Sequence, residues 1–157
     1  MIDFARKLYL LLIAVASSFQ SLLLLAVRLY WGWQFMQTGW GKLHNLARVT
    51  QFFTSLGIPA PGLNAGFFSG LELVGGVLLA VGLASRPVAL LFVGDMLVAY
   101  ITADRTAFFS FFSDPDKFVG AAPCAFLCAS LVILIFGPGR FSLDTLVGRW
   151  FLKRTTG

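Results

Sequence analysis

Apolar residues fill four long stretches of the chain, and short segments rich in polar residues, glycine or proline separate them. A helix needs about 20 residues to cross the hydrocarbon core of a bilayer. The four stretches are close to that length, so the pattern predicts membrane-spanning helices at residues 20–41, 64–83, 87–103 and 118–136.

The chain start is apolar as well, from Leu8 to Ala16. This pattern predicts an interfacial helix that extends the first span at its N-terminal side. A charged start and small residues after the apolar core are also typical of a signal peptide. A further long apolar stretch follows almost at once, which favours a retained, membrane-associated segment.

The connecting segments predict short helices and loops at the membrane surface. Residues 48–56 place apolar side chains on one side of a helix, and the glycines and prolines of residues 57–62 end it. The loop at residues 102–117 carries four phenylalanines among charged residues. After Gly137-Pro138-Gly139, the tail combines Leu146, Trp150 and Phe151 with Arg149, Lys153 and Arg154, which predicts an amphipathic interfacial helix.

Composition supports a membrane protein, because 58% of the residues are hydrophobic and only 12% are charged. Soluble domains typically have about 25% charged residues. A domain this small cannot bury so many apolar side chains, so lipid must surround them. We therefore expect an all-α integral membrane four-helix bundle, formed as a single domain by residues 1–157 and embedded in a lipid bilayer.

The formal net charge is +5, yet the basic residues lie mainly at the ends of the apolar stretches. That placement indicates membrane orientation and anionic headgroups, and not nucleic acid. With both termini inside, the inner segments hold more basic residues than the outer ones. The inner set is Arg6, Lys7, Arg86, Arg140, Arg149, Lys153 and Arg154, and the outer set is Lys42, Arg48, Arg105 and Lys117. The bias predicts a multi-pass protein with its N- and C-termini inside.

Three charged residues interrupt the apolar stretches: Arg28, Glu72 and Asp95. Their distances from the predicted helix ends place all three near the middle of the bilayer. An unpaired charge there costs at least about 2.5–3.5 kcal/mol, and one arginine can bind two carboxylates through its forked donors. We therefore expect Glu72 to point into the bundle within reach of Arg28. The cluster is either a structural ion pair or a midplane site for a quinone headgroup, a proton or a small solute.

Helical periodicity places each of these charges on a face with small or apolar neighbours. Glycines on two of the faces allow close approach of a neighbouring backbone. The first face is Arg28, Gly32, Phe35, Gly39 and Lys42; the second is Phe68, Ser69, Glu72, Gly76 and Leu79; the third is Leu91, Asp95, Ala99 and Thr102.

Other chemistry is sparse in the sequence. Cys124 and Cys128 are spaced i, i+4, wider than a redox Cys-x-x-Cys motif, and membrane cysteines are more often small apolar residues. His44 stands alone, so no metal site is predicted. No nucleophile elbow, phosphate loop or dinucleotide fingerprint is present, and no intrinsic cofactor is expected.

Several segments in order resemble the DoxX family. They are Arg28, then GWGKL at 39–43, FFTSLGIP at 52–59, LELVGG at 71–76, VGLASRP at 81–87 and GPGRFSLD at 137–144. The resemblance covers residues 22–144 and implies a bacterial inner-membrane four-helix bundle. It carries over Arg28, Lys42, Glu72 and Arg86, with Asp144 as a tail feature; Lys42 and Arg86 are expected at the interfaces.

The resemblance also implies a function in redox chemistry. Related DoxD-type proteins form part of a thiosulfate:quinone oxidoreductase, and some DoxX proteins associate with enzymes of thiol and oxidative stress. We expect a membrane subunit of a redox system that interacts with quinone, with the electron-carrying group on a partner protein. The alternatives are a non-catalytic scaffold or accessory subunit that anchors partner proteins, and a small-solute carrier. Protein partners or a homo-oligomer are expected in addition to the lipid bilayer. Four helices without an inverted repeat disfavour the carrier.

Overall fold

The computed structural model describes residues 2–155, apart from the side chains of residues 2, 3, 5, 149 and 151–155. Four longer helices form a membrane bundle: α1 (Ile2–His44), α3 (Pro61–Val81), α4 (Ser85–Thr102) and α7 (Ala122–Phe136). Shorter helices connect or follow them: α2 (Leu46–Ser55), α5 (Arg105–Phe108), α6 (Pro115–Gly120) and α8 (Leu143–Thr155). The prediction of an all-α membrane bundle is confirmed.

Three of the described helices are long and apolar enough to cross a membrane: α1 over Arg6–His44, α3 and α4. The helix α7 is apolar but has 15 residues, about 22 Å at the α-helical rise. The fourth predicted span, 118–136, is therefore interrupted. Ala121 has an extended backbone (φ −71°, ψ 135°) that separates α6 from α7, and Pro123 occupies the first turn of α7, where proline is well tolerated.

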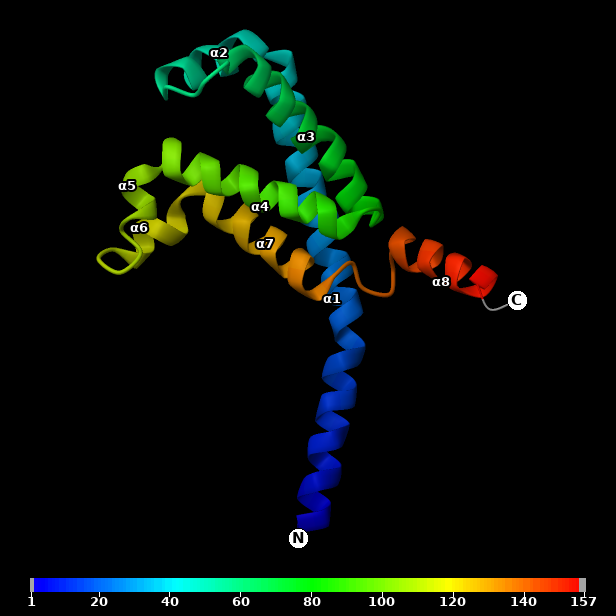
Figure 1. Ribbon diagram of the computed structural model, residues 1–157. Helices are drawn as coiled ribbons and strands as arrows, with labels where there is room; N and C mark the ends of the chain where they lie inside the picture. The colour runs from blue at the N-terminus through cyan, green and yellow to red at the C-terminus, as the bar shows by residue number, and fades with distance from the viewer. Residues whose placement is uncertain (1, 156–157) are drawn as a thin grey trace.

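The helix α1 is much longer than the predicted first span, because it runs without a break from Ile2 to His44. Its N-terminal half extends away from the other helices (Figure 1). Consecutive apolar side chains from Leu8 to Ile13 are all exposed there. The predicted helical extension over Leu8–Ala16 is thus present, but it continues the axis of α1 and is apolar on every side.

The bundle consists of two helix pairs. The helix α1 packs along α3, and α4 packs along α7, whereas contacts between the pairs are less extensive. Figure 1 shows the α4–α7 pair crossing α1 at a steep angle. The apolar core lies where the pairs meet, and its buried members are Phe35, Leu79, Val88, Ala89, Phe92, Met96 and Ile133.

Glycines set the close contact between α1 and α3. A Cβ added at Gly32 would lie 2.8 Å from the carbonyl oxygen of Gly76, and one added at Gly39 would lie 2.7 Å from that of Ser69. No side chain fits at these distances, so the two backbones touch directly. The register follows from these contacts: α1 and α3 are antiparallel, and Gly82 at the end of α3 meets the guanidinium of Arg28.

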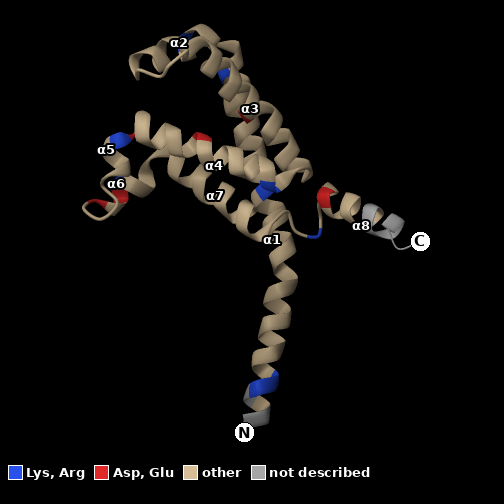
Figure 2. Ribbon diagram, viewed as in Figure 1, with Lys and Arg blue, Asp and Glu red and all other residues tan. Residues whose placement is uncertain are grey.

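The bundle has two ends: the α2 end, where α2 lies, and the Asp144 end, where the chain turns from α7 into α8. Lysine, arginine, aspartate and glutamate are few along the packed helices (Figure 2).

The predicted amphipathic tail coincides with α8, where Leu146 and Trp150 are exposed. The side chains of Arg149, Phe151, Lys153 and Arg154 lie outside the described residues.

Candidate functional site

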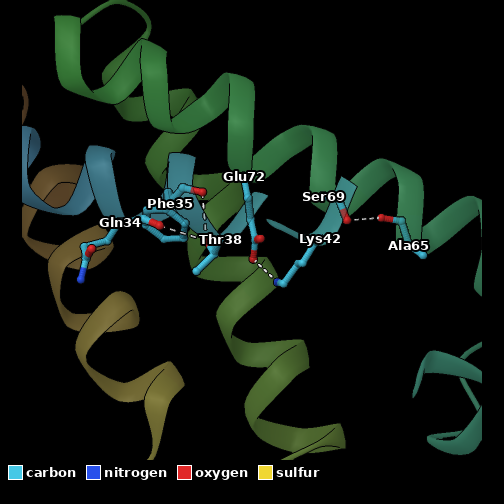
Figure 3. Close-up of polar contacts among 7 residues, drawn as sticks. All are labelled: Gln34, Phe35, Thr38, Lys42, Ala65, Ser69 and Glu72. Atoms are coloured by element: carbon cyan, nitrogen blue, oxygen red, sulfur yellow. Dashed lines mark hydrogen bonds and ion pairs between the residues drawn. The ribbon is translucent and has the colours of Figure 1, made fainter. Parts of the chain in front are cut away.

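Glu72 lies inside the bundle with only 2% of its surface exposed, as predicted. Its partner is Lys42, whose Nζ is 2.5 Å from Glu72 Oε1. Figure 3 shows the lysine of α1 and the glutamate of α3 pointing toward one another. The Lys42 side chain is 38% exposed, so the pair joins the protein interior to its surface.

The prediction that Glu72 pairs with Arg28 is wrong. Arg28 is fully buried at the Asp144 end, where its Nη2 donates a hydrogen bond to the carbonyl oxygen of Phe141. Lys42 follows Arg28 by fourteen positions on α1, which is about 21 Å along the helix axis. The apolar core around Phe35 and Leu79 fills the space between the two levels.

Asp95 does join Glu72. It is 8% exposed on α4 and lies close enough to interact electrostatically with both Glu72 and Lys42. One oxygen of each carboxylate, Glu72 Oε2 and Asp95 Oδ2, has no hydrogen-bond partner among the described residues. We call Lys42, Glu72 and Asp95 the charged cluster.

The charged cluster forms the floor of a cavity of about 280 Å³, here called the first cavity. The cavity lies between α2 and the C-terminal half of α4. Its other lining residues are mainly apolar: Val49, Phe52, Phe53, Leu56, Ile58, Phe68, Met96, Val98, Ala99 and Ala103, together with Arg48 and Thr102. An apolar pocket with a few convergent polar groups is typical of a small-molecule site.

The amphipathic helix predicted at 48–56 forms one wall of the first cavity. It corresponds to α2 (Leu46–Ser55), and no residue within it is buried. Its phenylalanines line the first cavity, and Phe53 meets Phe68 of α3 at a ring-centroid distance of 6.4 Å in an edge-to-face arrangement. The helix therefore covers the cavity and does not contribute to the core.

Asp144 organises the opposite end. Its carboxylate accepts hydrogen bonds from the backbone N–H groups of Ala84 (2.7 Å) and Ser85 (2.8 Å), which begin α4. Its own N–H donates to the carbonyl oxygen of Gly82. The nearby Arg28 interacts with it electrostatically. Arg28 and Asp144 thus hold the segment after α7 against the α3–α4 turn.

The remaining residues predicted from the sequence lie apart from the charged cluster. Arg86 is exposed and its guanidinium packs near Gly137. His44 is exposed, with Nδ1 2.9 Å from the carbonyl oxygen of Trp40. Cys124 is buried and Cys128 is exposed, and both are free thiols. Within residues 2–155, no three His, Cys, Asp or Glu side chains gather as metal ligands.

Sequence reasoning missed the contribution of Lys42 to this site, although Lys42 shares a predicted face with Gly39 and Phe35. It also missed Thr38, whose side chain lies beside Glu72 (Figure 3). Thr38 lies one turn before Lys42 on α1. That spacing is the signal that could have identified it.

Comparison with known proteins shows similarity across the segment that carries the charged cluster. The family model described as DoxX matches residues 23–105. A protein of Bacillus subtilis (strain 168), named "Putative oxidoreductase CatD", is 36% identical over 83 residues, which make up 53% of this chain and 60% of that protein. The match thus spans less than two thirds of the length of that relative. No solved structure matches the chain.

Proposed function

The chain belongs to the DoxX family, and from that premise we propose that it is the quinone-binding membrane subunit of a redox system. One observation carries the proposal above all others: an apolar cavity has an ion pair and two unpartnered carboxylate oxygens at its floor. The relative named as an oxidoreductase supports the same class of chemistry.

The first cavity suits a quinone headgroup in size and in chemistry. At about 280 Å³ it is near the lower end of ligand pockets, roughly 300–1,000 Å³, which suits one substituted ring. Phe52, Phe53 and Phe68 offer aromatic faces and edges for packing against that ring. An isoprenoid tail would extend from the cavity into lipid.

The charged cluster provides the polar contacts that a quinone requires. The ammonium of Lys42 can donate a hydrogen bond to a ring oxygen, while Glu72 and Asp95 can hold or deliver a proton at that oxygen. A bound quinone would supply two-electron, two-proton redox chemistry. Lys42 occupies the place beside Glu72 that the sequence predicts for Arg28, since Arg28 lies at the other end of the bundle.

The electrons would come from a partner protein engaged in thiol, sulfur or oxidative-stress chemistry. We place the protein in the bacterial plasma membrane with both termini inside. The long apolar extension of α1 is available to lipid, to a protein partner or to a second copy of the chain.

A matched pair of phenylalanines on α3 tests the proposal. Phe68 lines the first cavity, whereas its neighbour Phe67 is 60% exposed and lines none of it. For the purified protein in mild detergent, we expect Phe68→Ala to weaken binding of a short-chain quinone roughly tenfold, about 1.4 kcal/mol, and Phe67→Ala to leave it unchanged. Binding is measured by calorimetric titration, with chromatographic assay of quinone extracted from untreated protein.

Two results would contradict the proposal. One is a wild-type protein that binds no quinone in titration and carries none on purification. The other is equal binding by the Phe67→Ala and Phe68→Ala variants. A quinone-free protein that purifies with a stoichiometric partner would favour the scaffold.

A further inference from the structure

A second cavity lies on the other side of the Lys42–Glu72 pair, with a volume of about 170 Å³. Lys42, Glu72, Met96 and Ala99 line both cavities, so the ion pair and one stretch of α4 form the partition between them. The residues that line only the second cavity are Thr38, Ala122, Pro123 and Phe126. The second cavity therefore lies between α1, α4 and the first turn of α7.

The mouth of the second cavity is formed by exposed residues. Thr38 of α1 and Ala122 at the start of α7 are both exposed, whereas Pro123 is buried behind them. Ala122 directly follows the break at Ala121 that separates α7 from the polar segment containing α6. The interrupted fourth helix thus places the cavity mouth next to this polar segment, where we expect water to reach it.

The charged groups at the partition have a net charge that one additional proton would neutralise. Two carboxylates, Glu72 and Asp95, interact with a single ammonium, Lys42, and one oxygen of each carboxylate has no partner among the described residues. Arg48 of α2 lines the first cavity but is exposed, so water screens its charge. The contribution of α7 to the second cavity is apolar. A proton shared by the two carboxylates would neutralise the cluster.

Resting on the proposed quinone function, we propose that the second cavity is the route by which protons pass between the aqueous phase at the α2 end and Glu72. Reduction of a quinone to a quinol takes up two electrons, supplied by the redox partner, and two protons. A quinone in the first cavity covers that side of the charged cluster. Protons then reach Glu72 past Thr38 and Ala122, where the quinone does not stand in their way.

Thiol labelling tests whether the mouth is open to water, and it needs no quinone. In a chain carrying Cys124→Ala and Cys128→Ala, we expect Ala122→Cys to react with a charged, membrane-impermeant methanethiosulfonate. The reaction should occur from the same side of the membrane as that of Ser113→Cys in the exposed loop. The matched control is Ala125→Cys, which is exposed on α7 but lines neither cavity, and it should stay unlabelled in lipid.

Blocking the mouth tests whether protons use this route. The shared proton should give an infrared band of a protonated carboxyl group that disappears in Asp95→Asn or Glu72→Gln. With a short-chain quinone bound in the first cavity, we expect Ala122→Phe to slow the isotope shift of this band in heavy water at least tenfold, with Ala125→Phe as the control at the wild-type rate. Quinone affinity should be unchanged in Ala122→Phe, because Ala122 does not line the first cavity.

The outcomes separate this inference from the quinone function. Equal isotope exchange in the two phenylalanine variants, an absent carboxyl band, or an unlabelled Ala122→Cys would each overturn the proton route, even for a protein that binds quinone. Absence of quinone binding with open, blockable exchange would overturn the quinone function and leave the proton route standing.

Discussion

Lys42 reaches the carboxylate of Glu72 because side chains on a helix lean toward its N-terminus. On α1 that direction leads from the α2 end toward the interior of the bundle. The long methylene stem carries the ammonium inward, so a residue expected at the interface contributes its charge to a buried site. The lean brings the ammonium near the carboxylate, and the 2.5 Å contact between Nζ and Oε1 is a charge-assisted hydrogen bond.

Removing the charge of Lys42 should destabilise the protein. Lys42→Met leaves the Glu72 carboxylate buried without its donor, and an unsatisfied buried acceptor costs about 1–3 kcal/mol. We expect a lower midpoint of thermal unfolding in detergent, with partial recovery in the double variant Lys42→Met/Glu72→Gln. Lys117→Met, at an exposed position, is the control. A double variant less stable than either single one would argue against the pair.

Asp144→Ala should loosen the opposite end, because two backbone N–H groups at the start of α4 lose their acceptor. Loss of a helix N-cap costs about 0.5–2 kcal/mol. We expect a matching drop in unfolding free energy and faster proteolysis between Gly137 and Arg140. Asp116→Ala, an exposed carboxylate of α6, should change neither measurement. Unchanged proteolysis in Asp144→Ala would show that Arg28 alone holds the segment.

The sequence predicted the burial of Glu72 but not its partner. The cost of a lone charge in lipid indicates that Glu72 must turn inward, and this holds whatever the register of the helices. Which residue pairs with Glu72 depends on the depth of each side chain in the membrane. The apolar pattern predicts a first span that begins at residue 20, whereas α1 begins at Ile2 and Arg28 meets Gly82 at the end of α3. Only the contacts between α1 and α3 fix that alignment.

At the scale of elements, the bundle depends on how closely α1 and α3 approach. Gly32 and Gly39 on one helix and Gly76 on the other meet the opposing backbone. Hydrophobic burial does not drive helix association in lipid, so close packing of this kind must provide much of it.

A methyl group in this contact should separate the helices. A Cβ at Gly39 would lie within 3 Å of the backbone of α3, and overpacking typically costs about 1–3 kcal/mol. We expect Gly39→Ala to lower the thermal stability and to weaken the Lys42–Glu72 pair. Gly70→Ala is the matched control, since a Cβ there meets nothing within 4 Å; its stability should stay within about 0.5 kcal/mol of wild type. Similar losses in both variants would contradict this packing argument.

Element positions were largely predictable, and the departures have physical causes. Proline at the start and glycine at the end delimit α3, where Gly82 adopts the left-handed conformation that ends helices (φ +75°). The break at Ala121 was missed because the apolar pattern continues through it. The sequence predicts the run from Leu8 as a separate element, because a single span needs only about 20 residues. The 43 residues of α1 extend about 65 Å, which exceeds the thickness of a bilayer.

At the scale of the whole molecule, the distribution of basic residues predicts the orientation in the membrane. Arg86 and Arg140 lie at the Asp144 end, and Arg48 lies at the α2 end. Most of the basic residues assigned to the inner side belong to segments at or beyond the Asp144 end, which the positive-inside rule places in the cytoplasm.

A topology reporter tests that orientation. A cytoplasm-active reporter fused after Gly157 should be active, and a periplasm-active reporter at the same position should be silent. Fusions within the loop after α5, for example after Ser113, should give the opposite pattern. Periplasmic activity of the Gly157 fusion would reverse the orientation without changing the fold.

The glycine contacts between α1 and α3 have a mechanical consequence for the site. Backbones in direct contact resist displacement, so we expect α1 and α3 to move together and to keep Lys42 near Glu72. Asp95 belongs to the other, less tightly joined pair, α4 with α7. Any hinge motion between the pairs changes the Glu72–Asp95 separation, and with it the repulsion between two carboxylates. A change in the protonation of either carboxylate would therefore change the force that acts between the two helix pairs.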